Sequence, residues 1–128
     1  MKGIFTFVNG IKIINCTRES IKFRCPDNNI VKVKPSEIDL GKESIVKENK
    51  TNINELYELI KISVHPTKEG RKIINSIYMQ HGIDTVIIGY EREARTYPGE
   101  VVNTIGESMI GTSKIAYCNK FTIRGNNE

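Results

Sequence analysis

Residues 87–99 carry the residue types best suited to holding a phosphate. Their apolar run ends at Gly89, and the residues that follow can form a short helix before a Pro-Gly pair stops it. A helix that begins directly after a strand places free backbone N–H groups and the positive end of its dipole at the strand terminus. Tyr90 and Tyr97 fall on one face of this helix. The pattern therefore predicts an anion site with an aromatic ring beside it.

Arg92 and Arg95 lie on a second face of the same helix, together with Thr96. Two guanidinium groups on one face suit a pyrophosphate, because each can donate a forked pair of hydrogen bonds. The alternative is a solvated surface helix in which Glu91 and Arg95 form an ordinary pair four residues apart. Spacing alone favours the solvated helix, since most charge runs face water.

Residues 106–114 are a second candidate phosphate loop, with two glycines, three hydroxyl residues and a lysine. Ser113 and Lys114 are its candidate ligands. The glycines are not followed by Lys-Ser or Lys-Thr at the offset that a Walker loop requires, so a flexible hairpin loop is the alternative. This loop motivates one competing hypothesis, a nucleotide hydrolase or transferase that uses Ser113 and Lys114.

The histidines and cysteines are too scattered to indicate a metal site or a nucleophile with its base. His65 and His81 have no cysteine or second histidine at ligand spacing. The cysteines are odd in number and widely spaced, which is typical of reduced cytosolic thiols (Cys16, Cys25 and Cys118). We predict a binding protein rather than an enzyme, with no metal and no cofactor.

The charge pattern indicates local basic pockets rather than a uniform basic surface. The net charge is +4 and the isoelectric point is near 9.0. Residues 11–34 are basic, with six cations against two acids, whereas residues 35–60 carry more acids than bases. A small nucleic-acid-binding protein is therefore a second competing hypothesis, although no nucleic-acid partner is expected. Because no apolar run is long enough for a membrane span or a secretory signal, we expect a cytoplasmic protein.

The elements that must position these residues begin with two hairpins. Asn9-Gly10 between β-rich runs is a strong hairpin signal, and it joins residues 3–8 to residues 11–14. A second hairpin joins residues 21–25 to residues 30–34 and gathers its lysines and arginines on one wet face. Residues 36–54 are polar and are predicted to form an arm or loop.

A main helix is predicted over about residues 66–81, because Thr67 can cap it and apolar residues recur at helical spacing before Gly82. The other predicted elements are a strand at 56–64, whose start could instead be helical, a short strand at 83–89, a short helix near 90–97, and strands at 101–104, 114–118 and 121–124. Together they predict a single α+β domain over residues 1–128. Its sheet is expected to be mainly antiparallel and built from hairpins.

Three runs of residues carry a resemblance to a known family. They are FTFVNGIKIINCT at 5–17, PTKEG at 66–70, and the pattern of Ile-Ile-Gly, Ala, Tyr-Pro-Gly and Val-Val over 87–102. These runs resemble the Thoeris anti-defence sponge family of phages and prophages. The resemblance covers most of the chain outside residues 36–54.

The resemblance implies a non-enzymatic sponge. Members of the family sequester cyclic ADP-ribose isomers made by bacterial TIR-domain proteins, and some also take up cyclic oligonucleotides of CBASS systems. The resemblance implies a homo-oligomer, either a dimer or a trimer of dimers, with pockets at a subunit interface. It also implies that the ligand is released intact.

Matching positions suggest roles for particular residues in such a pocket. The resemblance implies Tyr90 or Tyr97 as the ring against adenine and Asn103 as a polar contact. It assigns the phosphate contacts to the two arginines of the short helix. Arg18 and Arg24 become candidates for a second site that takes cyclic oligonucleotides.

Overall fold

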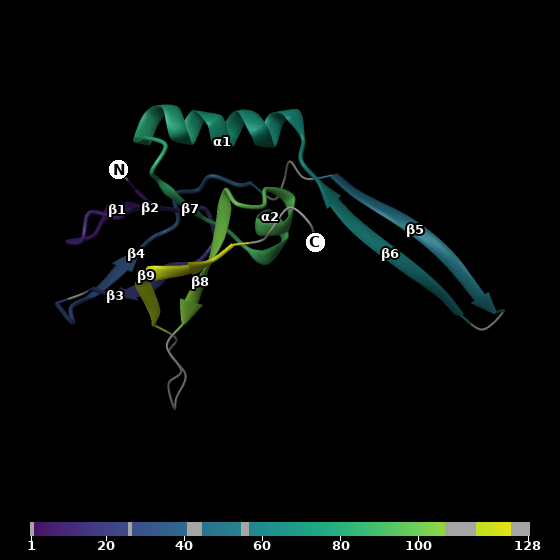
Figure 1. The fold of residues 1–128 in the computed structure, drawn as a ribbon, viewed down its shortest axis with the longest axis horizontal. Coiled ribbons are helices and arrows are strands. Elements are labelled where there is room, and N and C mark those ends of the chain that lie inside the picture. The colour runs from purple at the N-terminus through teal and green to yellow at the C-terminus, as the bar shows by residue number, and fades with distance from the viewer. Residues whose placement is uncertain (1, 26, 41–44, 55–56, 107–114, 124–128) are drawn as a thin grey trace.

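The computed structural model describes residues 2–25, 27–40, 45–54, 57–106 and 115–123, and from 45 to 64 it gives the course of the backbone. These residues form an α+β fold, as predicted, in which a seven-stranded sheet carries two helices and a two-stranded ribbon extends to one side (Figure 1). The strands of the sheet follow in the spatial order β1 (Ile4–Thr6), β2 (Lys12–Asn15), β7 (Val86–Ile88), β8 (Val101–Gly106), β9 (Ala116–Thr122), β3 (Ile21–Arg24) and β4 (Ile30–Val33).

The two N-terminal hairpins form where the sequence predicts them. β1 pairs antiparallel with β2, and β3 pairs antiparallel with β4. The first chain reversal lies between Phe7 and Ile11 and contains Gly10 at a φ of 88°, which a side chain would disfavour. The second contains Asn28 at a φ of 67°, a conformation that asparagine tolerates.

The prediction of a mainly antiparallel sheet is confirmed in part, because three of the strand pairings are parallel. β2 pairs parallel with β7, β7 with β8, and β3 with β9. Antiparallel pairing joins β1–β2, β3–β4, β8–β9 and the two strands of the ribbon. Parallel neighbours need a crossover, and α2 (Glu91–Thr96) supplies it between β7 and β8. The carboxyl ends of β2 and β7 consequently lie at one edge of the sheet.

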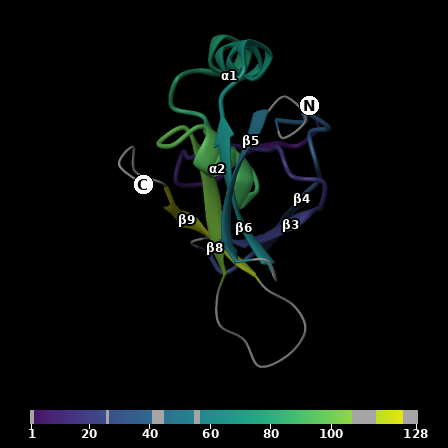
Figure 2. The same cartoon turned by 90° about the vertical axis from the view of Figure 1, so that its right-hand side faces the viewer.

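The main helix, α1 (Lys68–His81), lies along one side of the sheet in both views of the fold (Figures 1 and 2). It begins where predicted, because the Thr67 hydroxyl accepts a hydrogen bond from the Gly70 backbone N–H at 3.0 Å. It ends at Gly82, whose φ of 102° and ψ of 153° lie outside the left-handed helical region that a glycine stop usually occupies.

Both faces of the central strands are buried, which explains why their sequences are continuously apolar. Ile14, Ile87 and Val101 pack in one cluster with α1, α2 and Leu40. An adjacent residue on each strand points the other way, into a cluster that also contains Phe7 and Phe23 (Ile13, Ile88 and Val102). The link between β7 and α2 runs close to β8 at Gly89, because a Cβ on Gly89 would lie 2.7 Å from Val101 Cγ1.

The two-stranded ribbon consists of β5 (Ile45–Asn54) and β6 (Tyr57–His65). The predicted strand at 56–64 is confirmed by β6, and the helical alternative for its start is wrong. β5 corrects the prediction of an arm or loop over 36–54, because most of that segment is a strand paired antiparallel with β6 from Ile45↔His65 onward. A polar segment can still be a strand where a neighbouring β-branched strand supplies backbone partners along one edge.

Candidate functional site

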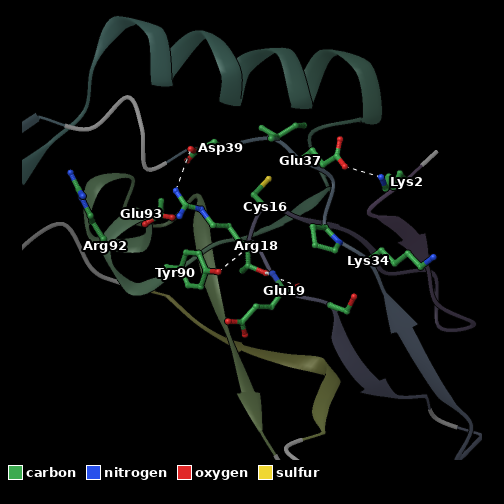
Figure 3. Close-up of a pocket in the computed structure, with 14 residues that line it drawn as sticks. Lys2, Cys16, Arg18, Glu19, Lys34, Glu37, Asp39, Tyr90, Arg92 and Glu93 are labelled. Atoms are coloured by element: carbon green, nitrogen blue, oxygen red, sulfur yellow. Dashed lines mark hydrogen bonds and ion pairs between the residues drawn. The ribbon is translucent and has the colours of Figure 1, made fainter.

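A cavity of about 1140 Å³ opens where β2 and β7 end (Figure 3). One wall is the loop that follows β2, a second is the segment that follows β4, and a third is the start of α2. Ligands of open sheets with parallel strands commonly bind beyond the carboxyl ends of those strands. The parallel pairing of β2 with β7 therefore places the cavity where a ligand would be expected.

The shape of the loop after β2 is fixed by Asn15, the last residue of that strand. Its side-chain amide donates to the backbone oxygen of Glu19 at 2.8 Å and to that of Val33 at 3.1 Å. Its side-chain oxygen accepts from the backbone N–H and the hydroxyl of Thr17 at 3.0 and 2.6 Å. Asn15 is fully buried, so these bonds hold one wall of the cavity to β4 without competition from water.

Tyr90 and Arg18 meet at the middle of the cavity. The Tyr90 hydroxyl accepts a hydrogen bond of 2.9 Å from the Arg18 backbone N–H, while the ring stays 39% exposed. The Arg18 guanidinium extends toward Asp39, with Nη2 3.7 Å from a carboxylate oxygen, and it remains largely exposed (Figure 3). An accessible ring beside a weakly held guanidinium is a suitable surface for an aromatic base and a phosphate.

The charges around the cavity are balanced rather than uniformly positive. Its cations are Lys2, Arg18, Lys34 and Arg92, and its acids are Glu19, Glu37, Asp39 and Glu93. Lys2 hydrogen-bonds to Glu37 at 2.8 Å, which lowers the pKa of that carboxyl. Glu93 is buried in α2, and with Glu91 it makes the first turn of this six-residue helix acidic. These carboxylates would repel a phosphate bound at the start of α2, where the sequence predicts a phosphate site.

Two potential nucleophiles in the cavity wall, the Cys16 thiol and the Thr17 hydroxyl, are held in unreactive states. Burial raises the pKa of the Cys16 thiol to about 11, with a smaller opposing effect from its hydrogen bond to Ser36. A thiol with that pKa is protonated at neutral pH, and the thiolate is the form that attacks. The Thr17 hydroxyl is engaged by Asn15 at 2.6 Å. Within the described residues, no group of three or more His, Cys, Asp or Glu side chains is arranged to hold a metal ion.

A smaller hollow of about 270 Å³ adjoins the cavity, and Tyr90 lines both spaces. Asn103 lines it and donates from its side-chain amide to the Gly89 backbone oxygen at 3.1 Å. Tyr90 therefore borders both spaces, and Asn103 reaches only the smaller one.

Of the predicted site residues, Tyr90 and Arg92 line the cavity and Asn103 lines the adjoining hollow. Figure 3 shows the Arg92 side chain directed away from Tyr90, toward the outside of α2. Arg95 lines neither space and pairs with Glu91 at 3.1 Å, which is the solvated arrangement named as the alternative.

Thr96 and Tyr97 are structural residues in this fold. The Thr96 hydroxyl donates to the Arg92 backbone oxygen at 2.7 Å, and the side chains of Thr96 and Tyr97 are almost fully buried. Tyr97 belongs to the apolar cluster beneath α1, so its ring has no surface for a ligand.

The two proposed second-site arginines are separated. Arg18 lies in the loop before β3 and lines the cavity, whereas Arg24 is the last residue of β3 and lines neither space. Ser113 and Lys114 lie outside the described residues, as does most of the loop on which the hydrolase hypothesis rests.

Sequence reasoning named Arg18, which follows β2, but it did not identify Lys34 and Asp39, which follow β4, as site residues. The available signal was their position directly after apolar strands. That signal becomes informative only when the ends of β2 and β4 are known to meet, as they do through the hydrogen bond from the Asn15 side chain to the Val33 backbone oxygen, and the hairpin pattern did not indicate this.

The fold and the cavity define an α+β protein with a ligand-sized hollow at the carboxyl ends of two parallel strands. Comparison with family models, with curated proteins and with solved structures gave no match. Membership of the sponge family therefore stays a prediction from the sequence motifs. Within the described residues, neither helix has the length and apolar character needed to cross a membrane.

Proposed function

We propose that this protein binds a nucleotide with a phosphate or pyrophosphate group in the cavity beside Tyr90 and sequesters it without cleaving it. The candidate ligand is a cyclic ADP-ribose isomer, which the sequence resemblance implies. In that role the protein would act as a phage or prophage anti-defence protein in the bacterial cytoplasm, blocking Thoeris signalling and, through cyclic oligonucleotides, CBASS signalling.

The observation that carries this proposal is the meeting of Tyr90 and Arg18 in a cavity of about 1140 Å³. This volume accommodates a ligand of nucleotide size or larger, since small-molecule sites usually measure about 300–1,000 Å³. Tyr90 offers a ring for stacking, and Arg18 can exchange its 3.7 Å contact with Asp39 for a phosphate. Arg18 replaces Arg95 in the proposal, because Arg95 does not line the cavity and pairs with Glu91 instead.

Two further observations favour sequestration over turnover. Cys16 is the one thiol among the described residues that line the cavity, and it is protonated at neutral pH, while the Thr17 hydroxyl already donates within the protein. Glu93 is buried in the wall of the same cavity, but none of the described residues that line the cavity is a histidine that could act as its partner. This set of groups suits binding by stacking and charge-assisted hydrogen bonds.

The test is uptake of a TIR-generated cyclic ADP-ribose isomer by the purified protein, with mass spectrometry of the free ligand before and after heat denaturation. We expect depletion near one ligand per site and recovery of the unchanged isomer. Recovery of ADP-ribose or nicotinamide products would show turnover and refute sequestration. Light scattering on the same sample measures whether the chain is the predicted dimer or hexamer.

Matched variants locate the site. Arg18→Ala and Tyr90→Ala are expected to weaken uptake at least about tenfold, which corresponds to about 1.4 kcal/mol. Arg95→Ala removes the same charge from a surface that does not line the cavity, so it should bind like the parent protein. Equal losses in Arg18→Ala and Arg95→Ala would place the ligand elsewhere.

A further inference from the structure

The outer face of β4, β3 and β9 gathers basic side chains from distant parts of the sequence. Lys22 and Lys32 are both exposed and lie directly opposite each other in the β3–β4 register. On the same face of β3, Arg24 lies in register with Tyr117 of β9. Lys120 completes the group, with its Nζ 4.9 Å from the centre of the Tyr117 ring. We call these five residues the basic face.

The side chains of the basic face point away from the core. Phe23, between Lys22 and Arg24, is fully buried, and so are Val33 and Cys118 on the neighbouring strands. Because side chains alternate along a strand, Lys22, Arg24 and Lys32 must share the opposite side. Tyr117 is half-buried, so part of its ring is accessible.

The three strands that carry this face contribute basic residues and no acidic ones. The nearest acid in the hairpin, Asp27, sits in the turn and hydrogen-bonds to Asn29 through both carboxylate oxygens. The Lys22–Lys32 pair places like charges opposite each other, an arrangement that costs stability and is relieved when an anion lies between them.

We infer that the basic face binds single-stranded nucleic acid, at a site separate from the cavity. Phosphates of a strand would lie along Lys22, Lys32 and Arg24, and an unpaired base would stack on Tyr117 between Arg24 and Lys120. This combination of cations with an accessible ring on a sheet suits single strands, because every base has a face that can stack. A surface that recognised anionic lipid or an acidic peptide would need the cations but not the ring. None of the five residues lines the cavity or the adjoining hollow.

The test uses the full chain and fluorescently labelled oligonucleotides of about 20 nucleotides, single-stranded and duplex, with binding measured by fluorescence anisotropy from about 50 to 200 mM NaCl. We expect the single strand to bind more tightly than the duplex. The double variant Lys22→Gln with Lys32→Gln should weaken single-strand binding at least about tenfold and reduce the salt slope by about 1.4, or about 0.7 for each lost phosphate contact.

Two comparisons separate recognition of single-stranded nucleic acid at the basic face from a general attraction between a basic protein and a polyanion. Lys68→Gln with Lys72→Gln removes the same charge from exposed positions of α1 and should leave binding nearly unchanged. Tyr117→Leu should weaken single-strand binding at least about fivefold while Tyr117→Phe retains it, because the ring and not the hydroxyl stacks. Thermal unfolding of each variant confirms that it is folded.

Three results would overturn the inference. The first is no saturable binding of either oligonucleotide at the lowest salt concentration. The second is an equal loss in the β3–β4 and α1 double variants. The third is binding to phosphatidylserine vesicles as tight as to the single strand and insensitive to Tyr117→Leu, which would assign the face to anionic surfaces in general.

Discussion

At the scale of single residues, Asn15 connects the loop that follows β2 to the end of β4. Its amide group donates to Glu19 in the loop and to Val33 in β4, and its oxygen accepts from both the backbone N–H and the hydroxyl of Thr17. A buried polar group that is fully hydrogen-bonded fixes the conformation of the backbone around it. If that group is removed, its former partners stay buried without a hydrogen bond, because water cannot reach them.

We therefore predict that Asn15→Ala lowers the free energy of unfolding by about 2 to 4 kcal/mol. Asn75→Ala, at an exposed position of α1, should change it by less than about 0.5 kcal/mol. Urea denaturation followed by circular dichroism measures both values. A small effect at Asn15 would mean that the loop after β2 finds other partners.

Cys16 makes the free energy of unfolding depend on pH under alkaline conditions. Burial raises its pKa from 9.0 to about 11 in the folded state. Between these values the unfolded chain loses the thiol proton while the folded chain keeps it, so the free energy of unfolding falls as pH rises. The stability that Cys16 contributes is present below pH 9 and is lost by about pH 11.

The size of this effect is about 2 to 3 kcal/mol between pH 9 and pH 11, at about 1.36 kcal/mol for each unit of pKa shift. We predict that Cys16→Ala, although less stable at neutral pH, loses less stability over this interval than the parent protein. Denaturation curves at several pH values give the two slopes. Parallel slopes would show that Cys16 does not titrate differently in the two states.

At the scale of elements, α1 and the segment after α2 meet at a contact that requires glycine. A Cβ on Gly70 would lie 1.7 Å from the Tyr97 hydroxyl oxygen and 2.9 Å from its Cζ. Tyr97 cannot withdraw, because it is fully buried beneath the helix, and the Arg71 guanidinium lies 5.4 Å from its ring centre. Within the described residues its hydroxyl is buried without a hydrogen-bond partner.

We predict that Gly70→Ala destabilises the protein by about 1 to 3 kcal/mol, because overpacking outweighs the gain of up to about 1 kcal/mol that alanine brings to a helix. Tyr97→Phe should be nearly neutral, since it removes a hydroxyl that makes no bond. The double variant should recover part of the loss, and thermal unfolding of all three gives the coupling energy. Additive effects would argue against the contact.

At the scale of the whole molecule, the ribbon of β5 and β6 is a sheet of its own. It shares no strand with the seven-stranded sheet, and its base is closed by the pair Ile45↔His65. An isolated two-stranded hairpin contributes little stability in water. The core beneath the helices and the cavity therefore depend on the larger sheet.

We predict that replacing residues 46–64 with an Asn-Gly turn, which can join two paired residues directly, leaves the sheet folded. The variant should unfold cooperatively, with a free energy of unfolding within about 1 kcal/mol of the parent. Denaturant unfolding measures this value, and ligand uptake by the variant tests the cavity separately. A noncooperative transition would show that the ribbon belongs to the folding unit of the sheet.

Local sequence was sufficient for many of the elements. Asn9-Gly10 and the alternation of residues around it determined the first hairpin, and Thr67 determined the start of α1. The two N-terminal hairpins, α1, α2 and β6 all depend on signals within a few residues of one another. These signals act through local backbone geometry and capping, so a single chain segment contains them.

Only the tertiary structure decided which strands are neighbours and what they bring together. The pairing of β2 with β7 joins residues that are far apart in sequence, and it is fixed by burial of both strand faces rather than by any turn signal. The same long-range packing set Arg18 beside Tyr90, buried Tyr97 and aligned Tyr117 with Arg24. Sequence alone thus determined residue types and local elements. The cavity and the basic face arise from contacts that form only when the whole sheet assembles.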